Sequence, residues 1–196
     1  MKSRRTLRAE MRRRRRAISE PERARMAEAV ARHLGASLRV RRARRVACYL
    51  SNDGEMDLGP VMDFLRGNGK QVLLPALRGN ELWFLPCDRH TPLALNRFGI
   101  PEPDVAAHTR CRPRDLDLVL MPLVAFDASG NRLGMGGGFY DRAFSYLRNR
   151  AFWKKPLLLG VAYEFQRLET LASRPWDVPL HGVATEKGLY RIRGHG

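Results

Sequence analysis

The sequence contains no apolar stretch of the roughly 18 residues that a membrane-spanning helix needs, and its longest apolar runs have the length of a strand. It also lacks the cysteine pattern of a disulfide framework or a zinc cage, because its three cysteines are odd in number and none forms Cys-x-x-Cys. The first residues are basic and lack the apolar segment of a secretory signal, although an arginine-rich start is also typical of organellar transit peptides. We therefore expect a cytoplasmic protein without a membrane partner.

Lysine is scarce, since only 5 of the 36 basic residues are lysines and the other 31 are arginines. Aromatic residues are absent from the first 48 positions. The net charge is +16, and residues 1–45 hold 17 basic against 4 acidic residues, which accounts for 13 of that excess. A surplus of this size is typical of nucleic-acid-binding proteins, but base stacking requires aromatics among the cations. A specific nucleic-acid partner is therefore not expected, although weak nonspecific binding at low salt is.

Strand-like and helix-like segments alternate along the chain. Apolar runs typical of buried strands cover residues 45–50, 71–75, 81–85, 116–121 and 157–162. Helical patterns cover the arginine-rich start, residues 58–65 and residues 138–148, and Ser19-Glu20-Pro21-Glu22 is typical of a capping box that opens a helix to about residue 39. This alternation predicts an α/β fold with a mostly parallel sheet covered by helices on both faces, and residues 1–196 are expected to form a single domain.

Residues 130–142 read Gly-Asn-Arg-Leu-Gly-Met-Gly-Gly-Gly-Phe-Tyr-Asp-Arg and form the most informative segment. Glycines let backbone N–H groups curl around an anion, and a helix is predicted to begin at Gly137 or Gly138 with its unpaired N–H groups at the glycines. Neither a Walker A loop nor the dinucleotide fingerprint fits, because no lysine follows and no glycine stands at position 139. Arg132 and Arg142 would supply positive charge. The alternative is a glycine turn whose charged residues are merely solvated.

The wider sequence resembles the 5-formyltetrahydrofolate cyclo-ligase family, also called methenyltetrahydrofolate synthetases. Residues 126–142 match that family's Phe-Asp-x-x-Gly-x-Arg-Leu-Gly-x-Gly-x-Gly-Tyr/Phe-Tyr-Asp-Arg motif. Further landmarks follow in order: Arg4 to Arg8, Tyr49-Leu50 with Glu55, Phe98-Gly99-Ile100-Pro101-Glu102-Pro103, Gly160 to Tyr163 with Gln166, and Asp177 before Thr185. The chain departs from the commoner pattern at Phe139, at Gly137 where many members have lysine, and at Trp176 where the usual residue is histidine.

The resemblance implies a three-layer, Rossmann-like α/β architecture and a definite reaction. In that reaction 5-formyltetrahydrofolate and ATP give 5,10-methenyltetrahydrofolate, ADP and phosphate, with Mg²⁺ as the metal ion. The formyl oxygen attacks the γ-phosphate, N10 then closes the ring, and phosphate leaves. The work of the protein would be positioning and charge neutralisation.

The resemblance also implies roles for individual residues. Mg²⁺ would be held by Asp141 with help from Asp177, because this ion prefers a few carboxylate oxygens. Glu55 would accept hydrogen bonds from the pterin, with Leu50 and Phe98 flanking its rings, and Tyr140 would orient the reacting oxygen. The catalytic residues would be Arg132, Tyr140 and Asp141. ATP would be bound by Arg4, Arg8, Arg132, Leu133, Gly134, Met135, Gly136, Gly137, Gly138, Phe139 and Tyr140.

Structural interpretations remain open for several of these positions. Leu50 and Phe98 have the chemistry of core residues, and Asp177 and Glu55 lie in sequences that also suit turns. Asp127 with Gly130 suits a type I turn and is expected to be structural. Two alternatives to the main function remain, namely a basic nucleic-acid-binding module and an enzyme of the same fold that acts on another formyl substrate. The chain is expected to be a monomer or a weak dimer.

Overall fold

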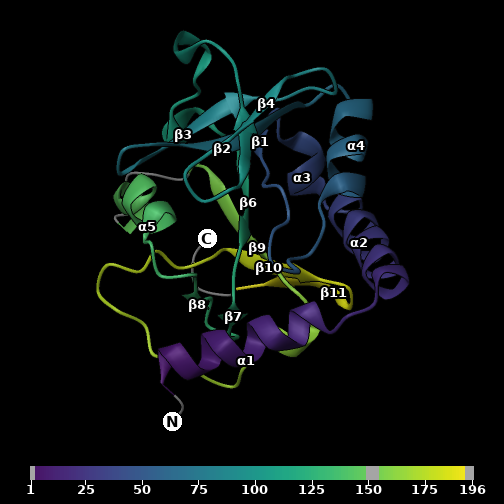
Figure 1. Cartoon of the computed structure of the whole chain (residues 1–196). Coiled ribbons are helices and arrows are strands. Elements are labelled where there is room, and N and C mark those ends of the chain that lie inside the picture. The colour runs from purple at the N-terminus through teal and green to yellow at the C-terminus, as the bar shows by residue number, and fades with distance from the viewer. Residues whose placement is uncertain (1–2, 149–154, 193–196) are drawn as a thin grey trace.

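The computed structural model describes residues 3–148 and 155–192, and a seven-stranded sheet lies at the centre of the molecule (Figure 1). The strand order is β11-β10-β9-β6-β1-β2-β3. Adjacent strands from β10 to β2 run parallel, whereas β3 and β11 are antiparallel edge strands. The strands are β1 (Arg45–Ala47), β2 (Gln71–Arg78), β3 (Glu81–Pro86), β6 (Leu118–Pro122), β9 (Leu157–Val161), β10 (Gly182–Thr185) and β11 (Gly188–Arg191).

Helices and two small antiparallel ribbons surround this sheet. The α-helices are α1 (Arg4–Arg16), α2 (Glu20–Gly35), α3 (Leu38–Arg42), α4 (Gly59–Gly67) and α5 (Phe139–Ala143). Short 3₁₀ turns cover Ala107–Thr109, Pro113–Asp115, Ser145–Arg148 and Glu164–Gln166. One ribbon pairs β4 (Leu93–Leu95) with β5 (Pro101–Pro103), and the other pairs β7 (Ala125–Phe126) with β8 (Arg132–Leu133).

The two faces of the sheet bury separate hydrophobic clusters. Val46, Leu120 and Val161 point to the face covered by α2, α3 and α4, where Val30 and Leu65 join them. The next residues along β1 and β6 point the other way, because side chains alternate along a strand. On that face Ala47, Met121, Phe144, Leu147 and Leu180 form the second cluster, which includes α5 and the turn after it. The expected three-layer α/β architecture with a mostly parallel sheet is therefore confirmed.

Two expected elements in the first part of the chain end earlier than the pattern indicates. The strand expected over residues 45–50 ends at Ala47, although the Cys48 N–H still donates to Leu73 O at 2.8 Å. The second helix ends at Gly35 and α3 follows as a separate element. Ser19 precedes α2 as expected, but its side chain forms no capping bond, and its hydroxyl instead donates to Glu22 Oε2 at 3.4 Å. The capping-box expectation was therefore wrong, although the helix starts where it predicted.

The helix expected over residues 138–148 begins at the predicted place but is short. Gly138 is its N-cap in the left-handed region, with φ of 64°, and regular α-helix ends at Ala143. The chain then tightens into the 3₁₀ turn after Phe144, whose buried ring packs 5.7 Å from that of Phe84. A single helical turn carries little macrodipole, so any anion at this end depends mainly on loop amides and on arginines.

The carboxyl ends of β1, β6 and β9 lie at one edge of the sheet, because these strands are parallel neighbours. The chain leaves β6 into the β7–β8 ribbon, and α1 crosses this edge beneath the ribbon (Figure 1). Met11 of α1 is 3% exposed and packs in one cluster with Val124, Ala125 and Leu133. The N-terminal helix is thus anchored across the end of the sheet where ligands gather in open α/β folds.

No helix in the described ranges is long and apolar enough to cross a membrane. The three cysteines are unpaired, and Cys48 is a buried core residue as expected. Asp127 is structural as expected, since its Oδ1 accepts hydrogen bonds from the backbone N–H groups of Ser129 and Asn131.

Candidate active site

The glycine-rich loop between β8 and α5 adopts backbone angles that other residues avoid. Gly136 has φ of 113° and Gly138 has φ of 64°. Arg8 of α1 lies against this loop, because its Nε donates to Gly134 O at 2.9 Å and its Cζ lies 3.6 Å from where a Cβ on Gly136 would be. Met135 is 49% exposed, so the loop borders solvent. The predicted loop and Arg8 are therefore brought together at an accessible surface.

Three guanidinium groups share this region. Arg4 Nη2 pairs with Asp177 Oδ2 at 3.0 Å, and the backbone N–H of Arg174 donates to the same oxygen at 2.9 Å. Burial lowers the pKa of Arg8, and the charges of Arg4 and Arg174 lower it further. Because two like charges lie close to the partly buried Arg8 guanidinium, an anion bound here would relieve the repulsion among these arginines. Arg174 was not predicted as a site residue from the sequence. Its only link to the site there is its position three residues before Asp177.

Arg132 and Asp141 form an ion pair beneath the glycine loop. The distance from Arg132 Nη2 to Asp141 Oδ1 is 2.7 Å, and the Val178 N–H donates to the same oxygen at 3.1 Å. Arg132 is 7% exposed, and its Nε has no hydrogen-bond partner among the described residues. Arg142, the other arginine of the motif, donates instead to Gly137 O at 2.8 Å. Of these two motif arginines, Arg132 is therefore the one with a buried N–H donor that has no partner among the described residues.

Glu55 lies in a second group, formed by residues that follow β1 and β9. Its side chain is 13% exposed, the Tyr163 hydroxyl donates to its backbone carbonyl at 3.3 Å, and the Tyr49 hydroxyl donates to Met56 O at 2.8 Å. Burial raises the pKa of Glu55, while the charge of Arg15 opposes that rise. The carboxylate of Glu55 is thus largely shielded from water.

Tyr140 connects these two groups. Its ring belongs to the second hydrophobic cluster and stacks on Phe144 with centroids 6.4 Å apart. Burial raises the pKa of its hydroxyl, the negative charge of Glu55 raises it further, and Arg132 opposes the rise. The charges of both Glu55 and Arg132 therefore act on the Tyr140 hydroxyl. A hydroxyl with a raised pKa stays protonated and can donate a hydrogen bond.

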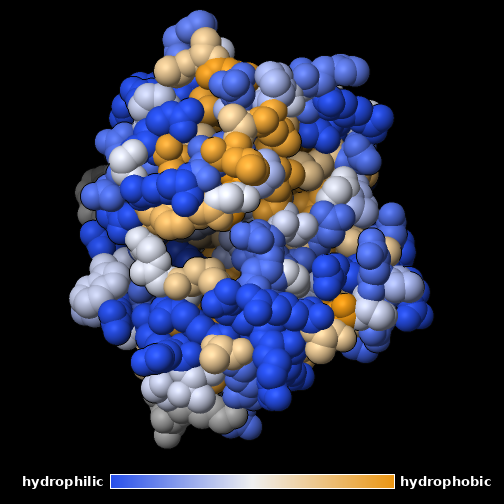
Figure 2. All heavy atoms as spheres, viewed as in Figure 1, coloured by the Kyte–Doolittle hydropathy of each residue, from blue (hydrophilic) through white to orange (hydrophobic). Residues whose placement is uncertain are grey.

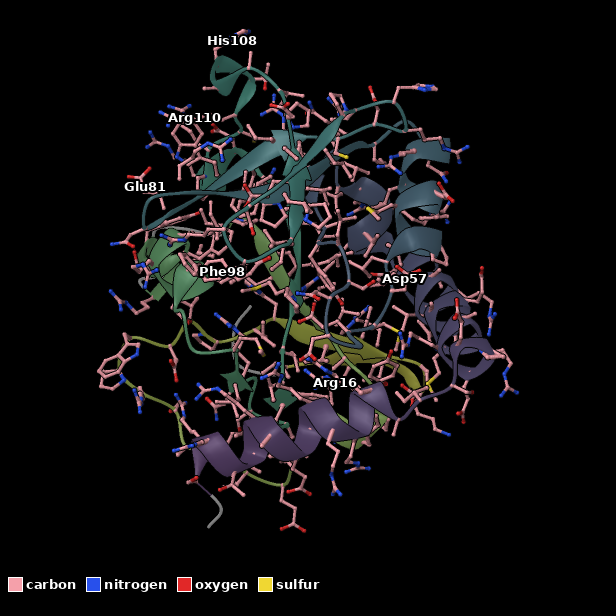
Figure 3. The ribbon with its side chains drawn as sticks, in the orientation of Figure 1. Arg16, Asp57, Glu81, Phe98, His108 and Arg110 are labelled. Carbon is pink, nitrogen blue, oxygen red and sulfur yellow. The ribbon has the colours of Figure 1, made fainter. Side chains whose placement is uncertain are left out.

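Leu50 and Phe98 differ in their exposure to solvent. Leu50 follows β1 and is half-buried against the core of the α2 face. Phe98 is 56% exposed in the turn between β4 and β5, where the Arg97 guanidinium lies 5.0 Å from its ring centroid (Figure 3). Phe98 is therefore not a core residue, and its ring is free to contact a ligand. Glu102 fixes this ribbon to β2 by accepting from the Leu77 N–H at 2.8 Å.

The carboxylates expected to hold a metal ion lie on neighbouring segments. Asp141 is joined to the segment of Asp177 by the Val178 N–H, and both of the bonds described above go to Asp141 Oδ1 rather than Oδ2. In the described ranges no group of three or more His, Cys, Asp or Glu residues is placed to hold a metal ion. Mg²⁺ commonly takes one or two carboxylates together with substrate phosphates and water. The oxygen chemistry of Asp141 and Asp177 fits such a shared site.

The arginine run of α1, residues 12–16, makes most of its contacts within the protein. Arg12, Arg15 and Arg16 all pair with Asp53, and the Arg14 guanidinium lies 4.3 Å from the ring centroid of Phe165. Arg15 is only 1% exposed. This arrangement could not be predicted from local sequence, because Asp53 is 37 or more positions away and is brought to α1 by the fold. Four of the five arginines of the run therefore have partners within the protein.

The surface is hollowed between the region of α5 and a band of hydrophilic side chains over α1 (Figure 2). Apolar side chains gather above the hollow on the same face, over the upper part of the molecule. A separate cavity of about 260 Å³ lies between the β2–β3 turn and the β4–β5 ribbon, with Arg78, Asn96 and Glu102 in its wall. Arg78 and Asn96 both bind Glu102 there, so these polar groups serve the ribbon.

Comparison with known proteins shows the family of this chain. Residues 1–186 match the sequence model of the 5-formyltetrahydrofolate cyclo-ligase family. The chain belongs to that family. A 5-formyltetrahydrofolate cyclo-ligase of Escherichia coli K12 is 38% identical over 183 residues, which cover 92% of this chain and 98% of the relative. The cyclo-ligase of Haemophilus influenzae is 38% identical over 159 residues, covering 80% of this chain and 83% of the relative.

A solved cyclo-ligase-family structure shares the fold over nearly the whole chain. The 5,10-methenyltetrahydrofolate synthetase of Aquifex aeolicus superposes with a TM-score of 0.82 at 35% identity, covering 97% of this chain and 93% of that one.

Proposed function

We propose that this chain catalyses the ATP-dependent cyclisation of 5-formyltetrahydrofolate to 5,10-methenyltetrahydrofolate, with release of ADP and phosphate. The observation that carries the proposal is that one helix, α1, lies against both an arginine-lined glycine loop and the shielded carboxylate of Glu55. The loop side has the chemistry of a triphosphate site, and the Glu55 side has that of a pterin site. Membership of the cyclo-ligase family supports the same reaction.

The triphosphate of ATP would lie against the glycine loop. Backbone N–H groups of residues 134–139 would donate to its oxygens, and Arg4, Arg8 and Arg174 would neutralise its charge. Asp141 and Asp177 would hold Mg²⁺, which when bound neutralises phosphate charge and orients the oxygens. Arg132 beneath the loop would stabilise the charge that builds up on the transferred phosphoryl group.

The pterin would lie on the Glu55 side. The Glu55 carboxylate would accept its N–H groups, with Leu50 and Phe98 against the rings. The Tyr140 hydroxyl would orient the formyl oxygen for attack on the γ-phosphorus, which breaks the bond to ADP. N10 then attacks the activated formyl carbon, phosphate departs with the former formyl oxygen, and the N10 proton is lost. The residues of this chain act by positioning and by charge, as in other phosphoryl transfers.

Purified protein should convert 5-formyltetrahydrofolate to the methenyl form, followed by its near-ultraviolet absorbance, only when Mg²⁺ and ATP are both present. A folded but inactive protein that binds RNA in a salt-dependent manner would instead support a nucleic-acid-binding module. The engagement of Arg12, Arg14, Arg15 and Arg16 within the protein argues against that outcome.

Replacing Glu55 by alanine is expected to lower kcat/KM for 5-formyltetrahydrofolate by about 100-fold, because two hydrogen bonds to a charged group contribute about 3 kcal/mol or more together. ATP binding, measured by calorimetry, should stay within about twofold of wild type. Glu28→Ala, an exposed carboxylate on α2, is the control and should be neutral. If Glu55→Ala leaves folate turnover intact, the substrate is held elsewhere and an enzyme of the same fold with another formyl substrate becomes the better interpretation.

Replacing Gly136 by alanine is expected to raise KM for ATP at least about tenfold, because φ of 113° strains an L-residue by about 1–3 kcal/mol and the loop must change its backbone conformation to relieve that strain. Gly79→Ala is the matched control, since it also has a positive φ, of 60°, but lies in the β2–β3 turn with open space around it. Steady-state kinetics with varied ATP distinguishes them. Equal KM values for ATP in the two variants would place the nucleotide away from this loop.

We expect the enzyme to act in the cytoplasm as a monomer or weak dimer, without a specific nucleic-acid or membrane partner. Gel filtration with light scattering at micromolar concentration measures the oligomeric state directly.

A further inference from the structure

Arg15 is a buried cation that the proposed chemistry does not use. Its Nη2 donates to Asp53 Oδ2 at 3.1 Å, and its Nη1 lies 3.7 Å from Glu55 Oε1, which is an ion-pair distance but too long for a hydrogen bond. Nε and Nη1 have no hydrogen-bond partner among the described residues. A buried charge with unfilled donors costs stability, and an apolar side chain would suit the fold at least as well. Fold stability alone therefore does not explain an arginine here.

The loop that carries Glu55 is shaped against α1. Asp53 has φ of 52°, and Gly54 follows with φ of 73°. A Cβ on Gly54 would lie 3.0 Å from the backbone carbon of Arg15, so only glycine permits this approach. The Asn52 N–H donates to Glu55 Oε2 at 3.2 Å. These contacts fix the distance between the loop and α1. They therefore also fix the position of the Glu55 carboxylate.

The arginines of α1 that face the site recur at the spacing of helical turns. Positions 4, 8, 12 and 15 fall on one side of a helix, next to the apolar side that packs on the β7–β8 ribbon. Arg8 contacts the glycine loop, and Arg15 contacts Glu55 two turns, about 10 Å, further along. Figure 3 labels Arg16, the residue after Arg15, at the C-terminal end of α1. One rigid helix thus contacts both halves of the site.

We propose that Arg15 is a positioning residue that fixes Glu55 for the pterin and supplies the positive charge that compensates the burial of its carboxylate. This inference rests on the proposed function, because it assigns the partner of Glu55 as the folate substrate. Asp53 also belongs to this arrangement, since its carboxylate anchors Arg15 together with Arg12 and Arg16.

The charged and titratable groups facing Glu55 come from four segments. They are Arg15 from α1, Asp53 from the same loop, Tyr49 after β1, and the tyrosines Tyr140 and Tyr163. Burial raises the pKa of Glu55, the charge of Arg15 lowers it, and the charge of Asp53 raises it. The pterin requires the ionised carboxylate, so folate binding is lost as pH falls through the pKa of Glu55. Removing Arg15 moves this loss to higher pH, and neutralising Asp53 moves it to lower pH.

The experiment measures KM for 5-formyltetrahydrofolate at saturating Mg-ATP from mildly acidic to mildly alkaline pH. In Arg15→Gln the acid limb should shift upward by about one pH unit or more, since an opposite charge at this distance changes a carboxyl pKa by about 1–3 units. At the acidic end this corresponds to a KM about tenfold above wild type. Arg13→Gln, an exposed arginine of the same helix, is the matched control and should follow the wild-type profile.

Two further variants separate charge from structure. Arg15→Lys retains the charge and should restore most of the pH profile, and Asp53→Asn tolerates the positive φ and should shift the acid limb downward. Opposite shifts for Arg15→Gln and Asp53→Asn support the proposal, because a general loosening of the loop would move both profiles the same way. Shifts of equal sign, or profiles that match Arg13→Gln, overturn it. If Arg15→Gln does not fold, the other two variants decide. The proposal then requires that Arg15→Lys keep most of the wild-type profile and that Asp53→Asn shift the acid limb downward.

The two proposals fail in different ways. Wild-type protein that does not turn over folate contradicts the proposed function before any Arg15 variant is made. Active wild-type protein with an Arg15→Gln profile equal to that of Arg13→Gln contradicts only the role of Arg15.

Discussion

Replacing Arg132 by glutamine is expected to lower kcat by about 10²–10³-fold, the loss seen when one preorganised donor to a developing charge is removed. The reason is its position, because Arg132 is 7% exposed beneath the glycine loop and has a buried Nε without a hydrogen-bond partner among the described residues. A group that is desolvated and fixed before the reaction stabilises transition-state charge more strongly than a mobile surface arginine. Single-turnover measurement at saturating ATP and folate isolates this step from binding.

The Arg132→Gln variant also removes the 2.7 Å ion pair with Asp141, so its fold must be checked by thermal unfolding. Arg132→Lys keeps a point charge near Asp141 but loses the planar fork, and we expect it to recover stability more than kcat. Arg112→Gln, an exposed arginine paired with Asp115, serves as the control for loss of a surface ion pair and should be neutral. A kcat for Arg132→Gln within threefold of wild type would show that Arg132 has a structural role only.

The architecture was predictable from the sequence because the signals that specify it are local. Apolar runs such as residues 157–161 have no polar position to face water, so they predict strands buried on both faces. Turn residues Arg78 to Asn80 separate two such runs, and the structure forms the β2–β3 hairpin there. The glycines before Phe139 predicted the start of α5 to within one residue. The length of that helix was not predictable, because Phe144 is drawn into a core cluster formed by distant residues.

The site was only partly predictable, since long-range contacts decide it. Motif residues such as Arg8 and Gly134 are 126 positions apart, and the resemblance to a family connected them where periodicity could not. The roles of Arg15 and Arg174 had no local signal. Arg15 is one of five consecutive arginines, and only the fold distinguishes it as the buried one by placing Asp53 and Glu55 beside it.

Replacing Asp141 by asparagine is expected to lower kcat/KM for Mg-ATP by about 100-fold or more, because a metal ion at a transferring phosphoryl group contributes several kcal/mol. Asparagine retains the shape and an oxygen that can accept from the Val178 N–H and from Arg132, so the local structure is preserved. What it loses is the negative charge of the metal ligand. The Mg²⁺ concentration for half-maximal activity should therefore rise together with the loss of rate.

Asp177→Asn should have a smaller effect on the Mg²⁺ requirement than Asp141→Asn. The Oδ2 of Asp177 already accepts from Arg4 and from the Arg174 N–H, so part of its bonding capacity is used in holding the cationic cluster. Its replacement should mainly raise KM for ATP, because Arg4 is released from its partner. Titrations of activity with Mg²⁺ at fixed ATP, with the partly exposed Asp115→Asn as a control, test this ranking. If Asp141→Asn loses rate while its Mg²⁺ requirement stays at the wild-type value, Asp141 acts through Arg132 and the metal ion is held by other groups.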